Sequence, residues 1–294
     1  MNLFALLLGL GIERLLTHLF HLREFRWLDP AFDRVLGRLR GKPRGVVLAS
    51  LIGLAVLLTA PVALLSWLLA DALFFLPAFI LAVFVLLFSL GPRDLKEEVD
   101  EYAVAADAGN EEEARRVAKE LLEADVPEDH GAKARLVERA TFVQANNRIF
   151  GVVFWFLIFG PTGAWFFRVL DLMRRRTAFR YADDATLIGC VRTVHGIFAW
   201  IPARLLAVGY ALAGSFEESV ADWRGYYANC APGIFDVNND ILSRAGIGAA
   251  GRAESSVAVT PSAGARAAMD LVLRTLWVIW CPVIAVLTLL NIVS

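Results

Sequence analysis

The amino-acid sequence predicts an all-α, polytopic helical membrane protein with a transmembrane hairpin, a re-entrant or broken helix and a cytoplasmic helical insertion. Hydrophobic residues make up 57% of the 294 residues, and the mean hydropathy is +0.56. A water-soluble protein needs more polar cover than this composition supplies. The formal net charge of −1 does not support a nucleic-acid-binding face. The three cysteines are scattered and predict neither a disulfide framework nor a zinc site.

The hairpin is predicted between Val46 and Gly91, where Asp71 carries the only formal charge. Val46–Ala70 and Ala72–Gly91 are each long enough, as helices, to cross a hydrocarbon core of roughly 30 Å. The break around Asp71 is short, so we expect a tight turn at a membrane face. Both ends of the hairpin then lie on the same side of the bilayer.

The first apolar stretch, Leu3–Phe20, is interrupted by Glu13 and Arg14. Two interpretations stay open: an interfacial helix whose charges face lipid headgroups, or an intramembrane charge site that faces the bundle interior. No basic residue precedes its apolar run Leu3–Ile12, and no small-x-small cleavage site follows that run. We therefore expect it to be retained and not cleaved as a signal peptide.

A basic segment, Arg23–Arg44, links this stretch to the hairpin. Asp29 followed by Pro30 predicts a helix start, with Asp29 as the N-cap. The apolar residues that follow form one stripe, with arginines on the other side: Phe32, Val35, Leu36 and Leu39. This pattern is typical of an amphipathic helix on an anionic surface, and the positive charge predicts a cytoplasmic location.

The next segment, Arg93–Arg148, is polar and acidic and predicts three helices. The first ends at Gly109, and Asn110 caps the second, whose first turn is acidic. Two i,i+4 ion pairs are expected on the second helix: Glu111/Arg115 and Glu112/Arg116. The acidic surplus indicates a solvated face, with a metal-binding or partner-docking surface as the alternative.

A bend is predicted at Gly160-Pro161, in the middle of the apolar stretch Ile149–Phe167. The basic run Arg174–Arg176 follows and should be cytoplasmic. A broken or re-entrant helix satisfies this charge bias, because proline removes a backbone donor and clashes with the preceding turn. The alternative is a full crossing that overrides the charge bias.

The following apolar stretch, Thr193–Phe216, contains Trp200, Pro202 and Arg204. Arginine near mid-span is expensive, which favours a functional site. The alternative is that Arg204 snorkels or binds carbonyls that Pro202 leaves free. We expect His195 to be a helix-end hydrogen-bonding residue.

One polytopic membrane domain is expected over residues 1–294, with residues 93–148 as a cytoplasmic helical segment within it. Residues 217–268 are expected to form a polar loop region, and Leu271–Ile292 a last span. Within the polar region, Asp236–Asp240 and Gly246–Gly251 have the composition of loops or loosely packed surface.

Several short motifs follow one another in a characteristic order. The chain opens with Gly11-Ile12-Glu13-Arg14-Leu15 and Arg26-Trp27-Leu28-Asp29. The later motifs are Arg93-Asp94-Leu95, Gly109-Asn110-Glu111, Phe154-Trp155 before the Gly-Pro bend, and Trp200-Ile201-Pro202-Ala203-Arg204-Leu205. In these motifs the whole chain resembles the AmpE branch of the AmpE/CobD-CbiB membrane protein family.

The CobD/CbiB branch comprises adenosylcobinamide-phosphate synthases, which form an amide by phosphate-activated coupling, and several positions of its pattern are altered here. Its Glu-Asn-x-x-Asp-Gly stretch falls at Val143–Arg148, and its Asp-Asp-x-x-Asn stretch falls at His195–Ala199. Its Ser-Pro-Asn segment has no clear counterpart near Ala231–Gly233. The loss of these carboxylates removes the natural candidates for Mg²⁺ ligands and for a general base. Arg93 and Arg204 remain able to hold an anionic group.

The resemblance implies an inner-membrane regulatory or signalling protein of the AmpE type, linked to β-lactamase induction, antibiotic resistance and cell-wall recycling. We expect it to bind an anionic or nucleotide-like ligand without turnover, in a polar cavity framed by the Gly160-Pro161 segment and the Trp200–Arg204 helix. Residues 93–148 would relay ligand occupancy to a cytoplasmic protein partner. The predicted ligand-binding residues are Glu13, Arg14, Arg93, Asp94, Arg139, Asn146, Arg168, Trp200 and Arg204.

No catalytic or metal-binding residues are predicted. The cofactor is unknown, although the family resemblance allows ATP with Mg²⁺. Two alternatives stay open: a CobD/CbiB-like amide-forming synthase and a lipid or solute transporter. No nucleic-acid partner is expected, and the lipid bilayer is the expected environment.

Overall fold

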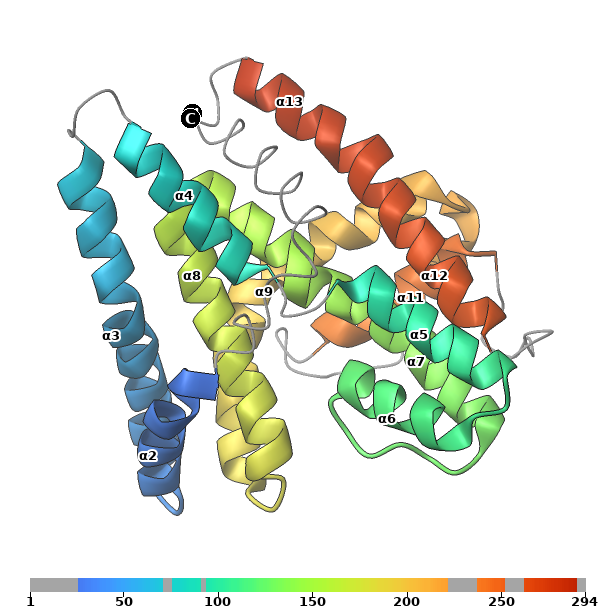
Figure 1. The fold of residues 1–294 in the computed structure, drawn as a ribbon, viewed down its shortest axis with the longest axis horizontal. Helices are drawn as coiled ribbons and strands as arrows, with labels where there is room; N and C mark the ends of the chain where they lie inside the picture. The colour runs from blue at the N-terminus through green and yellow to red at the C-terminus, as the bar shows by residue number, and fades with distance from the viewer. Residues whose placement is uncertain (1–25, 71–75, 91–93, 222–236, 252–261, 290–294) are drawn as a thin grey trace. The chain divides into compact units, whose positions relative to one another are not determined.

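The computed structural model describes residues 26–70, 76–90, 94–221, 237–251 and 262–289 (Figure 1). Within these ranges all regular structure is helical and no strand occurs, which confirms the all-α class. Four helical stretches are long and apolar enough to cross a membrane: Arg44–Leu69, His130–Arg180, Ala185–Ala213 and Ala263–Val286. The chain is therefore a polytopic membrane protein.

The chain divides into two compact units. Unit 1 comprises Met1–Arg93, Gly151–Phe198 and Ala285–Ser294. Unit 2 comprises Asp94–Phe150 and Ala199–Ile284.

Unit 1 is built around α8 (Gly151–Arg180), along which α3 (Arg44–Ala70) and α4 (Leu76–Ser89) both pack (Figure 1). A short 3₁₀ turn, Arg26–Leu28, leads into α2 (Asp29–Leu39), and α9 (Ala185–Ala213) contributes its first part. The predicted first arm of the hairpin is confirmed by α3. The second arm is described only over the 14 residues of α4, and the predicted turn at Asp71 lies outside the described residues.

The amphipathic pattern of α2 is confirmed, but its apolar side is buried inside unit 1. Phe32, Leu36 and Leu39 join the same buried cluster as residues of α3 and α8. The prediction that Asp29 caps the helix is wrong. Leu28 occupies the N-cap position, and the Asp29 carboxylate accepts a hydrogen bond from Arg176 Nη1 at 2.9 Å.

The predicted bend in α8 is confirmed at Gly160, whose φ of 63° and ψ of −152° lie outside the helical region. A Cβ added at Gly163 would lie 2.3 Å from the Trp155 carbonyl oxygen. Residues eight apart in a straight α-helix are separated by about 12 Å along its axis. The two limbs of α8 therefore fold back on one another, and glycine is required where they touch.

Two tryptophans of α8 donate to backbone carbonyls in proline-containing helices. The Trp155 indole donates to the Phe198 carbonyl at 3.0 Å, which has no intrahelical donor because Pro202 lacks an N–H. The Trp165 indole donates to the Leu58 carbonyl at 3.1 Å, three residues before Pro61. The first bond satisfies the one of these carbonyls that proline leaves without a helical partner.

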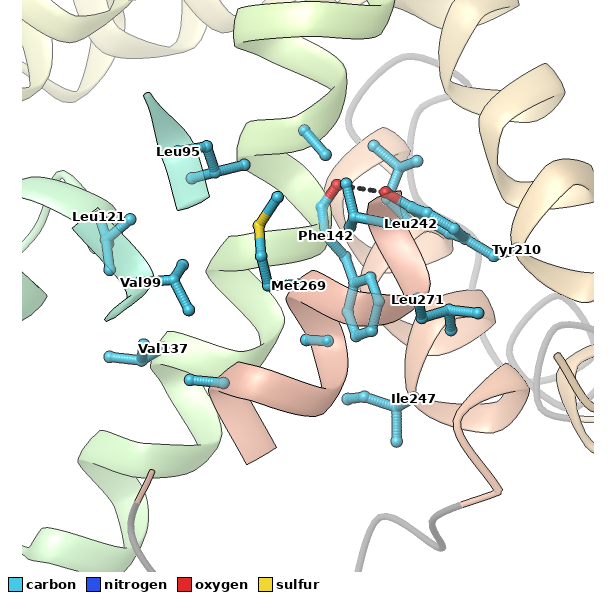
Figure 2. Packing of buried hydrophobic residues seen from close by; sticks show 14 of the residues in the cluster. Leu95, Val99, Leu121, Val137, Phe142, Tyr210, Leu242, Ile247, Met269 and Leu271 are labelled. Atoms are coloured by element: carbon cyan, nitrogen blue, oxygen red, sulfur yellow. Dashed lines mark hydrogen bonds between the residues drawn. The ribbon is translucent and has the colours of Figure 1, made fainter. Parts of the chain in front are cut away.

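Unit 2 is built around α7 (His130–Ala145), which packs against α5 (Leu95–Asp107), α6 (Glu111–Leu122), α11 (Asn238–Ala249) and α12 (Ala263–Arg274). A π-helical turn, Asn146–Phe150, follows α7. A second π-helical turn, Thr275–Trp280, leads from α12 to α13 (Cys281–Leu289). Figure 2 shows the core, where the Tyr210 hydroxyl donates to the Phe142 carbonyl at 3.0 Å.

The three helices predicted from the polar segment are α5, α6 and α7. Asn110 caps α6, and its Oδ1 accepts from the Glu113 N–H at 3.2 Å. The two predicted i,i+4 pairs are wrong. Arg116 instead binds Glu113, Glu120 and Glu101, and Glu111 pairs with Lys133 of α7.

Most of the loop predicted at Gly246–Gly251 belongs to a buried helix instead. Residues 246–249 belong to α11, and a Cβ at Gly246 would lie 2.4 Å from the Phe142 ring. The small residues that suggested a loop thus allow close helix packing.

Candidate functional site

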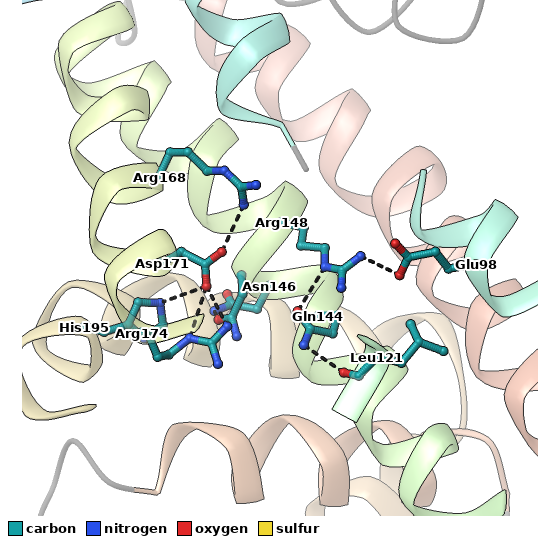
Figure 3. A network of polar contacts seen from close by, with 10 residues as sticks. Glu98, Leu121, Gln144, Asn146, Arg148, Arg168, Asp171, Arg174 and His195 are labelled. Carbon is teal, nitrogen blue, oxygen red and sulfur yellow. Dashed lines mark hydrogen bonds and ion pairs between the residues drawn. The ribbon is translucent and has the colours of Figure 1, made fainter. Parts of the chain in front are cut away.

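Unit 2 contains a buried polar cluster, which we call the π-turn cluster: Glu98, Gln144, Asn146, Asn147 and Arg148. Arg148 Nη1 donates to Glu98 Oε2 at 2.7 Å, and its Nε donates to Gln144 Oε1 at 3.1 Å (Figure 3). Gln144 Nε2 in turn donates to the Leu121 carbonyl of α6 at 2.9 Å. The guanidinium thereby links α5, α6 and α7.

The π-helical turn places three consecutive polar residues in the interior. Asn146, Asn147 and Arg148 are each 1% exposed. A π-helical turn widens the helix by one residue and is frequent at functional sites. This turn, at the end of α7, includes Asn146, which the sequence analysis predicted to be a ligand-binding residue.

The two asparagines hold unused hydrogen-bonding capacity. Asn146 Nδ2 donates to Asn147 Oδ1 at 3.3 Å. Asn146 Oδ1 and Asn147 Nδ2 are buried and have no hydrogen-bond partner among the described residues. Buried polar atoms of this kind are normally satisfied, so the pair presents one acceptor and one donor to a further group.

Tyr102 lies one helical turn beyond Glu98 on α5. Its side chain is fully buried, and its hydroxyl has no hydrogen-bond partner in the part of the chain that the structure describes. Burial raises the pKa of Tyr102 to about 12, because the phenolate would lose its hydration. The phenol therefore stays neutral at physiological pH.

Unit 1 contains a second cluster, which we call the Asp171 cluster: Arg168, Asp171, Arg174 and His195. Asp171 Oδ2 accepts from Arg168 Nη1 at 3.0 Å, and its Oδ1 accepts from Arg174 Nη2 at 2.6 Å (Figure 3). His195 Nε2 of α9 lies 3.9 Å from the same Oδ1. Arg168 and Asp171 are fully buried, so charge pairing offsets the desolvation of both groups.

The predicted ligand-binding residues are distributed over both units. Arg168 belongs to unit 1. Five of the predicted residues belong to unit 2: Asp94, Arg139, Asn146, Trp200 and Arg204. Glu13, Arg14 and Arg93 lie outside the described residues. Gly160-Pro161 and Trp200–Arg204 belong to different units, so the cavity that they were expected to frame stays a prediction.

Asp94 and Arg204 both make structural contacts. Asp94 is the N-cap of α5, and its carboxylate accepts from the Lys96 N–H at 2.9 Å. The Arg204 guanidinium lies 4.6 Å from the Trp200 ring centroid. It also donates to the Trp200 carbonyl at 3.2 Å and to the Asn238 side chain. The carbonyl that Pro202 leaves free is bound by Trp155 and not by Arg204.

Glu98 and Asp171 are absent from the predicted ligand-binding set. Asp171 could have been found from its spacing, because it lies three residues from both Arg168 and Arg174 and these neighbours share a helix face. Glu98 had no such signal, since its partner lies 50 residues away.

The donor set does not fit a Mg²⁺–ATP site. No group of three or more His, Cys, Asp or Glu side chains that could hold a metal ion occurs among the described residues. Glu98 and Asp171 each pair with arginine, whereas Mg²⁺ binds carboxylates that face it and the substrate phosphates.

The apolar spanning helices define an all-α polytopic membrane protein, whose interior holds buried arginine–carboxylate clusters. The chain belongs to the AmpE family: the model described as "Regulatory signalling modulator protein AmpE" matches residues 1–292. This match confirms the family that the motifs indicated.

The chain is also similar to two proteins named "Cobalamin biosynthesis protein CobD". It is 30% identical to that of Stutzerimonas stutzeri over 167 residues, which cover 56% of this chain and 54% of the relative. It is 26% identical to that of Chromobacterium violaceum over 198 residues, 66% of this chain and 61% of the relative. The matches thus cover little more than half of each CobD protein. No solved structure matches the chain.

Proposed function

We propose that this chain is a regulatory protein of the bacterial inner membrane, of the AmpE type, that contributes to β-lactamase induction and cell-wall recycling. It binds an anionic or nucleotide-like ligand and does not convert it. The observation that carries this proposal is the match of the AmpE family model to residues 1–292.

The π-turn cluster supports the ligand chemistry. Asn146 Oδ1 and Asn147 Nδ2 together offer an acceptor and a donor. These two neighbouring amides together offer the acceptor and the donor that a single asparagine offers to the edge of adenine. The Arg148 guanidinium of the same turn is paired with Glu98 and supplies the cationic group that an anionic ligand would bind in this proposal.

The same cluster supports binding without turnover. In the CobD/CbiB pattern that the sequence resembles, the positions of Asn147 and Arg148 hold aspartate and glycine. Here an amide replaces the carboxylate, and the remaining carboxylate, Glu98, binds Arg148 at 2.7 Å. A guanidinium-bound carboxylate is a poor general base and a poor Mg²⁺ ligand.

A relay to a cytoplasmic partner runs through α5 and α6 in this proposal. Glu98 belongs to α5, and Gln144 contacts the last turn of α6. A ligand that prefers one arrangement of the Arg148 guanidinium would shift the population of α5 and α6 positions. The exposed charged face of α6 would then present this change to the partner.

The test combines β-lactamase induction with ligand binding in the full-length protein. The double variant N146A/N147A removes both unused amide atoms, and N239A removes an exposed asparagine of α11 as the matched control. We expect the double variant to reach the membrane in normal amount yet lose complementation of an ampE-type deletion in an induction assay. We also expect it to lose binding of ATP, ADP or UMP used as nucleotide probes. Normal induction and binding by the double variant would refute the proposal.

The similarity to the two CobD proteins favours one alternative, a phosphate-dependent amide-forming synthase. The variant N147D restores a carboxylate at the position where the enzyme pattern has aspartate. Complementation of a cobamide-synthase deletion by the wild-type chain would support the enzyme. Failure of both wild-type and N147D proteins would count against it.

A further inference from the structure

One end of unit 1 gathers the ends of three membrane-spanning stretches. Arg40, just after α2, forms an ion pair with Asp183 in the turn between α8 and α9. Arg44 Nη2, at the start of α3, donates to Thr193 Oγ1 of α9 at 3.5 Å. The start of α3, the end of α8 and the start of α9 therefore lie together.

Besides Arg40, these segments carry six exposed cations, which we call the basic collar: Arg34, Arg38, Lys42, Arg44, Arg180 and Arg192. The acidic groups beside them are already held by other arginines. Arg176 binds Asp29 and Asp33, and Arg40 binds Asp183. Over the described ranges, no collar residue forms an ion pair of its own.

Contacts within unit 1 hold α2, the helix that carries Arg34 and Arg38, in place. The apolar side of α2 is buried, and Arg176 Nε donates to Asp33 Oδ1 at 2.9 Å. Tyr181 packs at the same place, with its hydroxyl donating to the Asp33 carbonyl at 3.3 Å. These contacts fix the orientation of α2. Its exposed side, which carries Arg34 and Arg38 one turn apart, therefore faces away from the core of unit 1.

Two collar residues lie at the ends of apolar stretches that are long enough to span a membrane. Arg44 begins the apolar stretch Arg44–Leu69, and Arg180 ends the stretch His130–Arg180. Exposed apolar side chains lie close to them in the chain: Val46 is 50% exposed and Phe179 48%. Lys and Arg are enriched just beyond the ends of spanning helices on the cytoplasmic side.

We propose that the basic collar binds the phosphate groups of anionic phospholipids, such as phosphatidylglycerol, in the leaflet where α3 begins and α8 ends. Clusters of four to eight Lys and Arg residues next to a spanning helix recognise anionic headgroups in this way. Guanidinium groups pair with phosphate through two parallel hydrogen bonds. The collar thus selects lipid independently of the ligand proposed for unit 2.

The test measures lipid retention by the full-length protein, purified in mild detergent, by native mass spectrometry. Phosphatidylglycerol and phosphatidylcholine with identical acyl chains are added at equal concentration. We expect the wild-type protein to prefer phosphatidylglycerol and the variant R34Q/R38Q/K42Q to lose affinity for it on the order of a hundredfold, about fivefold for each cation. The variant R34K/R38K keeps the charge and should retain the preference.

The control variant R115Q/R135Q removes two exposed cations of unit 2 and should bind both lipids as the wild type does. The wild-type preference should also weaken between about 0.05 and 0.5 M salt, a readout that needs no variant to fold. A triple glutamine variant that prefers phosphatidylglycerol as strongly as the wild type would overturn the proposal. So would a preference that salt leaves unchanged, an equal loss in the control, or displacement of the lipid by millimolar inorganic phosphate.

Discussion

Removal of Arg148 tests the π-turn cluster most directly. The variant R148M replaces a buried guanidinium by an apolar side chain of similar length. It removes the hydrogen bonds to Glu98 at 2.7 Å and to Gln144 at 3.1 Å. The Glu98 side chain is 3% exposed, so its carboxylate would then be buried without this partner.

Breaking a buried ion pair from one side costs about 3–5 kcal/mol, because the remaining charge is desolvated and uncompensated. The double variant E98Q/R148M removes both charges and should cost only about 0–2 kcal/mol, since apolar or neutral replacements of buried pairs are often tolerated. The cycle of E98Q, R148M and the double variant should give a coupling energy of about 2 kcal/mol or more.

Thermal unfolding in mild detergent, followed by circular dichroism, measures these differences. At about 2–4 °C per kcal/mol, R148M should melt about 6–20 °C below the wild type, and the double variant should recover most of that loss. A double variant as unstable as the sum of the two single variants would show that the pair does not act as a unit. The assignment of Arg148 and Glu98 to one cluster would then be wrong.

Three further predictions concern other contacts. G163A should lower the free energy of unfolding by about 1–3 kcal/mol, because its Cβ meets the Trp155 carbonyl at 2.3 Å; G53A, in open space, should be neutral or stabilising in the same melts. W155F should cost about 1–3 kcal/mol by leaving a carbonyl without its donor, whereas W277F at an exposed site should change stability by no more than about 0.5 kcal/mol. Y102F removes a buried hydroxyl without a partner among the described residues and should be neutral or stabilising by about 1 kcal/mol. The phenol ionises near pH 10 in the unfolded chain and near 12 in the folded one, so wild-type stability should fall as pH rises from 10 to 12, and Y102F should flatten that decline in urea titrations. An unchanged slope would contradict the assigned burial.

The elements that local chemistry determines could be predicted from the sequence. The bend at Gly160 follows from a glycine-proline pair, and the cap at Asn110 needs only its own turn and the next. The long apolar α3 follows from composition alone. In each case the interacting groups are neighbours in the chain.

The missed features depend on contacts between distant segments. Glu98 meets Arg148 across 50 residues, and no pattern near either residue indicates the other. The buried part of α11 resembled a loop because Gly246 packs against Phe142 of another helix. Steric fit of this kind is not visible in composition. The candidate site was predicted at Asn146, but its arginine–glutamate centre required the structure.

The separation of Glu98 and Arg148 along the chain has a consequence for biosynthesis. Translation proceeds from the N-terminus, so the acidic partner leaves the ribosome 50 residues before the basic one. The carboxylate that pairs with Arg148 is therefore made before the arginine is added to the chain. Pairing with Glu98 as the helices pack would spare Arg148 from being buried as an isolated charge.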